Sequence, residues 1–317
     1  MEEGKAPAFL RKNKTLIIAD LSLVFVALVW GANFVIMKDA LEQITPFAYL
    51  GVRFLLATFL LSAAFWRKLL KTRLDDLKCG LLAGFLLFSG YAVQTVGLMH
   101  TTPAKTGFIT GTSVVIVPFF YYLATKDHPG KGAFSGGFLA LAGLYFLSTG
   151  GGSLTEGFFL QYGDFLVLLC AFFFAAHLVT LGIISPCRST LVLSVLQLAV
   201  VGFLSLMTSL IFEPLSNLVI RSPHIWAAVL FAVLFCTIGA FVTQTAAQKH
   251  TRSTHAALIL STEAIFAGVF SYFFWGEAFT PPMVFGILLI MLGVLVTILK
   301  PDMNKVRWER ARLHRHQ

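Results

Sequence analysis

The segment HTTPAKTGFITGTSVVIVPFFYYLATKD, residues 100 to 127, aligns without a gap on HTRSTHAALILSTEAIFAGVFSYFFWGE, residues 250 to 277. The same offset of 150 extends the match upstream and downstream of both segments. Repetition at a fixed spacing predicts two copies of one structural unit. The matched pairs are His100 and His250, Thr101 and Thr251, Thr112 and Thr262, Phe120 and Phe270, Tyr122 and Tyr272, Gln94 and Gln244, Thr95 and Thr245, Gly136 and Gly286, and Gly143 and Gly293.

The start of the chain repeats more weakly, at an offset of 144. This offset sets Asn33 opposite His177 and Arg53 opposite Gln197. The internal boundary then falls near residues 150 to 162. We therefore predict two repeats, 16 to 150 and 151 to 299, between a short N-terminal segment, 1 to 15, and a basic tail, 300 to 317, that lies on anionic lipid heads.

The composition places both repeats in a lipid bilayer. Apolar residues make up 57% of the 317 residues, charged residues only 12%, and the mean hydropathy is +0.82. Soluble domains carry about twice that charge. Without water to satisfy the backbone, long apolar runs must be helices, so the predicted fold is an all-α membrane protein. Ten runs are long enough to cross about 30 Å of hydrocarbon: 16–37, 47–66, 79–99, 106–125, 133–149, 163–184, 190–212, 224–247, 254–275 and 282–299.

The basic residues give the orientation of these ten spans. Twenty of the 24 Lys and Arg residues fall on the side of the N-terminus; Lys38, Lys105 and Arg221 fall opposite, and Arg53 lies inside the second span. This bias predicts that both termini are cytoplasmic, in a multi-pass protein of the cytoplasmic membrane. The net charge of +9 is thus a topology signal, and no nucleic-acid partner is expected. Because each repeat has an odd number of spans, the second is inverted relative to the first.

Several motifs, in this order within a tandem repeat, are typical of one family. They are Trp30, Gly31, Asn33 and Phe34 in the first span, Pro46, Arg53 and Phe54 around the second, Pro118 in the fourth, and Gly276 with Glu277 after the ninth. Over residues 16 to 299 the chain resembles the drug/metabolite transporter superfamily, specifically its EamA branch. It departs from the pattern at Ala264, Asp127, Phe173 and Phe174. The resemblance implies transport of a metabolite by alternating access, coupled to protons or to exchange.

Two charged side chains inside the spans are candidates for function, because charge is costly in hydrocarbon. Arg53 lies roughly 10 Å deep at a rise of 1.5 Å per residue, and we expect a cavity or gating role, a structural ion pair or a helix-end anchor. Glu263 lies roughly 15 Å from either surface. It is the candidate for proton coupling or cation recognition, or else a neutral glutamic acid bonded to a neighbouring helix.

Neutral polar and aromatic residues complete the predicted binding site. Each of them also has an interpretation without a substrate. The amides could form interhelical hydrogen bonds, His177 could be a core histidine, and the aromatic rings could serve in packing alone. The predicted substrate-binding residues are Trp30, Asn33, Arg53, Tyr91, Gln94, Thr112, Ser113, His177, Gln244, Thr262 and Glu263. We expect them around a midplane cavity lined mainly by spans one, three, four, six, eight and nine. One cation, one carboxylate and several amides suit a zwitterion such as an amino acid, but equally many other metabolites.

Other functions and partners follow from the remaining patterns. The sequence contains no HExxH motif, no GxSxG motif and no paired midspan aspartates, which would indicate an intramembrane enzyme. It also contains no GxxxxGK[ST] loop, which would indicate nucleotide hydrolysis. A channel or lipid scramblase stays an alternative to the carrier. The four cysteines have no CxxC spacing, so no metal, disulfide or cofactor is expected. Matched glycines in spans five and ten predict a close helix contact, within the chain or in a homodimer.

Overall fold

The computed structural model describes residues 8–126, 131–149, 161–214, 222–251 and 253–299, and every regular element in these ranges is a helix. The first helix begins within the predicted N-terminal segment. The predicted basic tail and most of the predicted inter-repeat boundary lie outside the described residues. The helices are α1 (Ala8–Ala40), α2 (Pro46–Leu69), α3 (Leu74–Met99), α4 (Pro103–Gly111), α5 (Ser113–Thr125), α6 (Lys131–Thr149), α7 (Tyr162–Ile184), α8 (Thr190–Phe212), α9 (Pro223–Phe231), α10 (Ala240–Ala247), α11 (Ser253–Ser261), α12 (Glu263–Phe270) and α13 (Pro281–Leu299).

Eight helical stretches are long and apolar enough to cross a membrane within the described ranges. They correspond to predicted spans one to four and six to nine. Spans five and ten are the helices α6 and α13, whose described apolar stretches, Ser135–Leu147 and Pro281–Gly293, are shorter. The prediction of a multi-pass helical membrane protein is therefore confirmed, while the count of ten spans stays a prediction.

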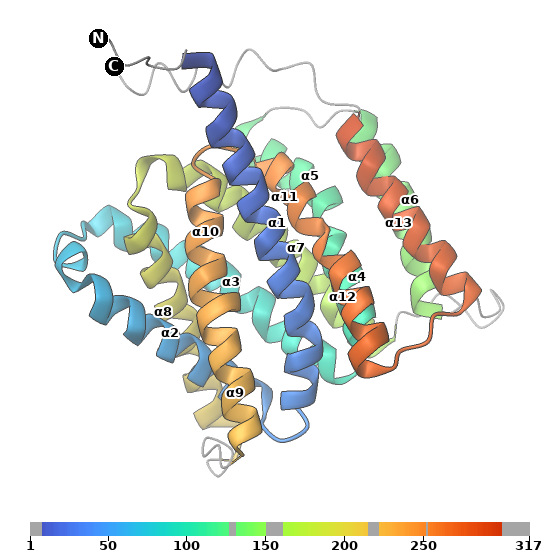
Figure 1. Ribbon diagram of the computed structural model, residues 1–317, viewed down its shortest axis with the longest axis horizontal. Coiled ribbons are helices and arrows are strands. Elements are labelled where there is room, and N and C mark those ends of the chain that lie inside the picture. Colours follow the sequence, from blue (N-terminus) through green and yellow to red (C-terminus); the bar gives the residue numbers. More distant parts are fainter. Residues whose placement is uncertain (1–7, 127–130, 150–160, 215–221, 252, 300–317) are drawn as a thin grey trace, which may run out of the picture.

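The helices form a central group with one pair on each side (Figure 1). Helix α2 packs on α8 at one side, and α6 packs on α13 at the other. Between these pairs lie α1, α3, α4, α5, α7, α10, α11 and α12. Helix α1 begins at the same end of the bundle at which α13 finishes. The central group is thus where a site can be enclosed on all sides by protein.

Three of the predicted spans are not single α-helices. The fourth is divided into α4 and α5 at Thr112, and the ninth into α11 and α12 at Thr262. The eighth contains a π-helical segment, Ala232–Gly239, between α9 and α10, and a second π-helical segment, Ser271–Trp275, follows α12. These interruptions have no proline at the break, so apolar length alone does not reveal them.

Two carboxylates cap helices that begin with Thr-Pro. Glu213, after α8, accepts hydrogen bonds from the Thr45 hydroxyl at 2.7 Å and from the Phe47 and Ala48 N–H groups at 2.9 Å each, at the start of α2. Glu277 accepts from the Thr102 hydroxyl at 2.6 Å and from the Ala104 N–H at 3.3 Å, at the start of α4. Free N–H groups and the helix dipole both favour an anion at a helix start. Both caps join distant parts of the chain.

Glycines allow α6 and α13 to touch backbone to backbone. A Cβ atom on Gly143 would lie 2.5 Å from the Gly286 carbonyl oxygen, and one on Gly286 would lie 2.6 Å from the Gly143 carbonyl oxygen. A Cβ on Gly293 would lie 2.6 Å from the Gly136 carbonyl oxygen. The matched glycines are therefore used within the chain. A homodimer through the same faces stays a prediction that a single chain does not test.

Arg53 is the largest fully buried side chain in the described part of the protein, and it joins α2 to the π-helical segment Ala232–Gly239. In that segment the Ala240 N–H bonds to the Phe235 and Thr237 carbonyls, whereas in an α-helix it would bond to Cys236. The Cys236 carbonyl instead accepts Arg53 Nη2 at 3.3 Å and Trp30 Nε1 at 2.9 Å.

A hydroxyl and two rings also contact the guanidinium, whereas its Nη1 is buried without a hydrogen-bond partner in the described structure. Arg53 Nε donates to Thr237 Oγ1 at 2.7 Å, and Cζ lies 5.1 Å from the Phe54 ring centre and 5.5 Å from that of Tyr91. No carboxylate lies within ion-pair distance of Arg53 among the described residues. The alternative of a structural ion pair is therefore wrong for the described ranges, because a freed carbonyl, a hydroxyl and aromatic faces take the place of an anion.

We predict that Gly143→Ala lowers the free energy of unfolding by about 1–3 kcal/mol, because the new methyl group must push α6 away from α13. Gly111→Ala is the matched control, since its Cβ would lie no closer than 3.5 Å to a neighbour. Thermal unfolding of both purified variants in one detergent measures the difference. Equal melting temperatures for the two would contradict the packing described here.

We predict that Thr237→Val costs about 2 kcal/mol of unfolding free energy, because a charged buried donor loses its hydroxyl acceptor while the side-chain shape is kept. Thr58→Val is the control: the Thr58 hydroxyl donates only to the Phe54 carbonyl, at 2.8 Å, within its own helix, and its loss should cost less than about 1 kcal/mol. If chemical denaturation ranks the two variants in the opposite order, Thr237 does not hold Arg53.

Candidate functional site

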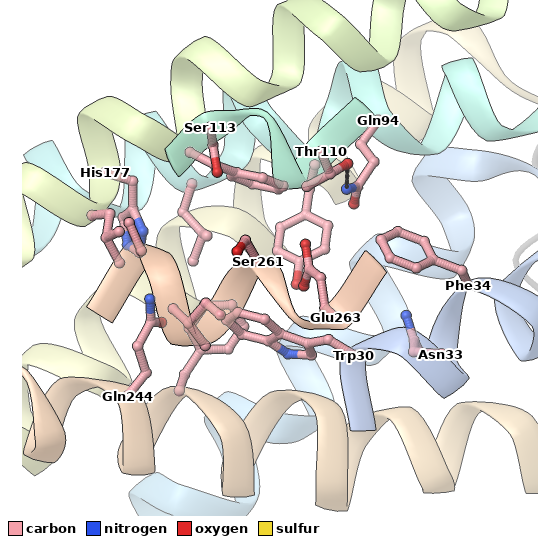
Figure 2. Close-up of a pocket in the computed structure, with 17 residues that line it drawn as sticks. Trp30, Asn33, Phe34, Gln94, Thr110, Ser113, His177, Gln244, Ser261 and Glu263 are labelled. Carbon is pink, nitrogen blue, oxygen red and sulfur yellow. Dashed lines mark hydrogen bonds between the residues drawn. The ribbon is translucent and has the colours of Figure 1, made fainter. Parts of the chain in front are cut away.

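A pocket lies in the central group of helices, with an empty volume of about 670 Å³ including its opening. Its walls come from α1, α3, α4, α5, α7, α10, α11 and α12, which make up spans one, three, four, six, eight and nine. Eight of the predicted site residues line it, and Figure 2 labels seven of them: Trp30, Asn33, Tyr91, Gln94, Ser113, His177, Gln244 and Glu263.

The two broken helices meet at this pocket with matching geometry. Thr112 has φ −64° and ψ −13°, and Thr262 has φ −64° and ψ −12°. Each hydroxyl donates to the carbonyl three residues earlier, Ile109 at 2.6 Å and Ile259 at 2.7 Å. The residue after each break, Ser113 or Glu263, lines the pocket. At both positions the dihedral angles stay in the right-handed helical region, so each span is tightened locally and not unwound, next to a polar residue that lines the pocket.

Glu263 is the buried carboxylate of the pocket, with 7% of its surface exposed. Figure 2 shows it extending from α12 into the space on the side of Thr110. It has no hydrogen-bond or ion-pair partner among the described residues. The predicted alternative, a bond from Glu263 to a neighbouring helix, is therefore not seen in the described ranges, and the carboxylate is available to a ligand.

Glycines bring the neighbouring helices close to Glu263. A Cβ on Gly31 would lie 2.8 Å from the Ala267 nitrogen and 2.9 Å from the Glu263 carbonyl oxygen, so α1 rests on the first turn of α12. Gly107 of α4 likewise faces the Ala267 side chain. Gly31 therefore explains part of the Trp30-Gly31 motif: it seats Trp30 and Asn33 beside the carboxylate.

Amide side chains supply hydrogen-bonding atoms on opposite walls. Asn33 Oδ1 and Gln244 Oε1 are buried and have no hydrogen-bond partner in the described structure. Gln94 is different, because its amide nitrogen donates to Thr110 Oγ1 at 3.0 Å (Figure 2). Buried polar atoms without partners are costly, so the oxygens of Asn33 and Gln244 are suited to accept from a ligand.

His177 is held from behind by a short chain of hydrogen bonds. Its Nε2 lies 2.9 Å from Gln197 Oε1, and Gln197 Nε2 lies 3.4 Å from Thr245 Oγ1. Because the Gln197 nitrogen donates to Thr245, its oxygen accepts, and His177 Nε2 carries the proton in this arrangement. The ring is thus fixed at the edge of the pocket. For the Nε2 atom, the structure therefore agrees with the alternative that His177 is a core histidine bonded within the protein.

Aromatic rings form much of the apolar wall. The ring centres of Trp30 and Phe241 are 5.4 Å apart, those of Tyr91 and Phe174 are 5.4 Å apart, and those of Tyr91 and Phe241 are 6.2 Å apart. Offset or edge contacts at these distances fix the orientation of each ring. Trp30 is further fixed by its bond to the Cys236 carbonyl. The wall is therefore rigid and flat-faced.

Three predicted site residues do not line the pocket. Arg53 lies behind Tyr91 and Phe54, and the hydroxyls of Thr112 and Thr262 are used at the helix breaks. The lining residues that the sequence prediction missed are Phe34, Leu87, Thr110, Phe174, Leu178, Phe241, Ala257, Leu260 and Ser261. Phe34 belongs to the first-span motif, so it could have been included; the others depend on helix rotation. No metal-binding group of His, Cys, Asp or Glu is found in the described ranges.

Comparisons with known proteins agree with this architecture. The family model of the EamA-like transporter family matches residues 17–149 and again 161–299. An uncharacterized transporter of Archaeoglobus fulgidus is 37% identical, over 89% of this chain and 86% of its own. An S-adenosylmethionine/S-adenosylhomocysteine transporter of Chlamydia muridarum is 26% identical, over 86% and 89%.

A solved crystal structure has the same fold, with a TM-score of 0.66 at 19% identity, over 89% of this chain and 96% of that chain. The family model covers both predicted repeats, and the more similar relative covers most of the chain. On these matches, the chain belongs to the EamA-like transporter family of the drug/metabolite transporter superfamily.

Proposed function

We propose that this membrane transporter is a secondary carrier that moves a small organic metabolite across the cytoplasmic membrane by alternating access. The observation that supports this most is the pocket with polar residues at two helix breaks, inside an otherwise apolar bundle. Discontinuous helices at the centre of a membrane bundle are typical of secondary transporters. The name of the Chlamydia muridarum relative, an S-adenosylmethionine/S-adenosylhomocysteine transporter, supports an organic metabolite as the cargo.

The proposed topology has ten spans in two inverted repeats, 16 to 150 and 151 to 299, with both termini cytoplasmic. Three helix contacts support it, because they join equivalent spans of the two repeats: α2 with α8, α4 with α12, and α6 with α13. Packing of each span on its own counterpart is what a two-fold axis between the repeats would produce. Rocking of the central helices against the side pairs would then expose the pocket to each side in turn.

We predict saturable transport by the purified protein in proteoliposomes. A thermal-shift screen with amino acids, nucleosides, sugars and organic cations selects the compound, and its radiolabelled form is then followed. Because a carrier exposes one site alternately, unlabelled compound on the far side should accelerate uptake. Ser113→Trp, which would fill the pocket, is the inactive control. An ionic current that does not saturate would instead support a channel, and lipid movement a scramblase.

We predict that Glu263→Gln removes the pH dependence of this transport, because glutamine keeps the size of the side chain but cannot exchange a proton. The initial rate is measured from mildly acidic to mildly alkaline pH. The other groups of the pocket that can titrate are His177 and Tyr91, so His177→Gln and Tyr91→Phe serve as controls and should keep the pH profile. An unchanged profile in Glu263→Gln would rule this residue out as the proton carrier.

A further inference from the structure

The pocket has a one-sided set of charges. Its lining contains one carboxylate, Glu263, and neither a lysine nor an arginine. Arg53, the cation inside the second span, is enclosed by Thr237 and Cys236, and Lys38, at the end of α1, donates to the Leu98 carbonyl at 2.7 Å. A ligand carboxylate would therefore meet no cation in this pocket. This argues against the zwitterionic substrate that the sequence suggested when Arg53 was expected at the site.

Several hydrogen-bond donors of the pocket are already used by the protein. The indole N–H of Trp30 donates to the Cys236 carbonyl, and the Gln94 amide nitrogen donates to Thr110 Oγ1. His177 Nε2 bonds to Gln197 Oε1. By contrast, the oxygens of Asn33 and Gln244 are buried without a partner. Donors of these three residues are thus used by the protein, whereas the side-chain amides of Asn33 and Gln244 are left for a ligand, each with an oxygen that accepts and a nitrogen that donates.

The aromatic wall suits a positively charged ligand with a flat apolar body. The faces of Trp30, Phe34, Tyr91, Phe174 and Phe241 carry negative partial charge and attract a cation within about 6 Å of a ring centre. They also provide apolar area for a planar ring system. A hydrated metal ion would gain little from such walls, because its ligands are oxygens. The walls therefore favour an organic cation.

We propose that this pocket selects organic cations with a planar apolar body, with Glu263 as the counter-ion and with Asn33 and Gln244 accepting hydrogen bonds from the ligand. This inference depends on the proposed function only in that the bound compound is the one transported. Binding itself is a separate property, and it can be measured without transport.

Four indole compounds with different charges test the proposal: tryptamine, indole-3-acetamide, tryptophan and indole-3-acetate, which are cationic, neutral, zwitterionic and anionic. Titration calorimetry on the full chain in nanodiscs at neutral pH gives each Kd. We expect tryptamine to bind at least about tenfold more tightly than each of the other three, in line with a desolvated cation–π contact. Equal Kd values, a tighter anion or zwitterion, or no tryptamine binding would overturn the proposal.

Variants assign the effect to the pocket. Glu263→Gln should remove most of the preference for tryptamine, whereas Asp39→Asn, which alters a half-exposed carboxylate bonded to His224, should leave it unchanged. If Glu263→Gln fails to fold, Asn33→Leu with Gln244→Leu tests the acceptor atoms, and an unchanged preference there overturns the proposal. Saturable flux of a neutral or anionic compound would support the carrier function and contradict the cation selectivity. Tryptamine binding without any flux would support the cation selectivity and contradict the carrier function.

Discussion

Hydrocarbon offers no hydrogen bonds, and this constraint shapes the whole protein. Every polar group within the bundle must find a partner in the chain or in a ligand. The π-helical segment Ala232–Gly239 shows how the chain meets this requirement: it frees the Cys236 carbonyl, and Trp30 and Arg53 both donate to it. Among the described residues, the buried side-chain atoms without a hydrogen-bond partner include Arg53 Nη1 as well as Asn33 Oδ1 and Gln244 Oε1, and of these three residues Asn33 and Gln244 line the pocket.

The site is built where the regular helix fails. At Thr112 and Thr262 the backbone tightens in the same way within the right-handed helical region, and the next residue lines the pocket. Glycine then allows α1 and α4 to press against the turn that carries Glu263. Three features of the site therefore have different causes. The Glu263 carboxylate follows the local tightening of its span, the glycines let the neighbouring helices approach, and the aromatic contacts fix the pocket walls.

Much of this could be predicted from the sequence, because length and hydropathy are enough to locate helices in a membrane. The ends of α8, Thr190–Phe212, agree with the predicted span to the residue, and the six pocket-lining spans follow from the repeat. Rotation about the helix axis does not follow from either. Arg53 was expected near the substrate because it is charged and deep, yet it turns toward Thr237. Phe241 and Ser261 carry no charge to draw notice, and they line the pocket.

The caps at Glu213 and Glu277 have a kinetic consequence. Each carboxylate closes the start of a helix in the first part of the chain from a position well after residue 200. A motion that separated α2 from the end of α8, or α4 from Glu277, would expose helix-start N–H groups that then need another acceptor. Separating the helices at either cap therefore has a barrier, although both glutamates lie outside the pocket lining.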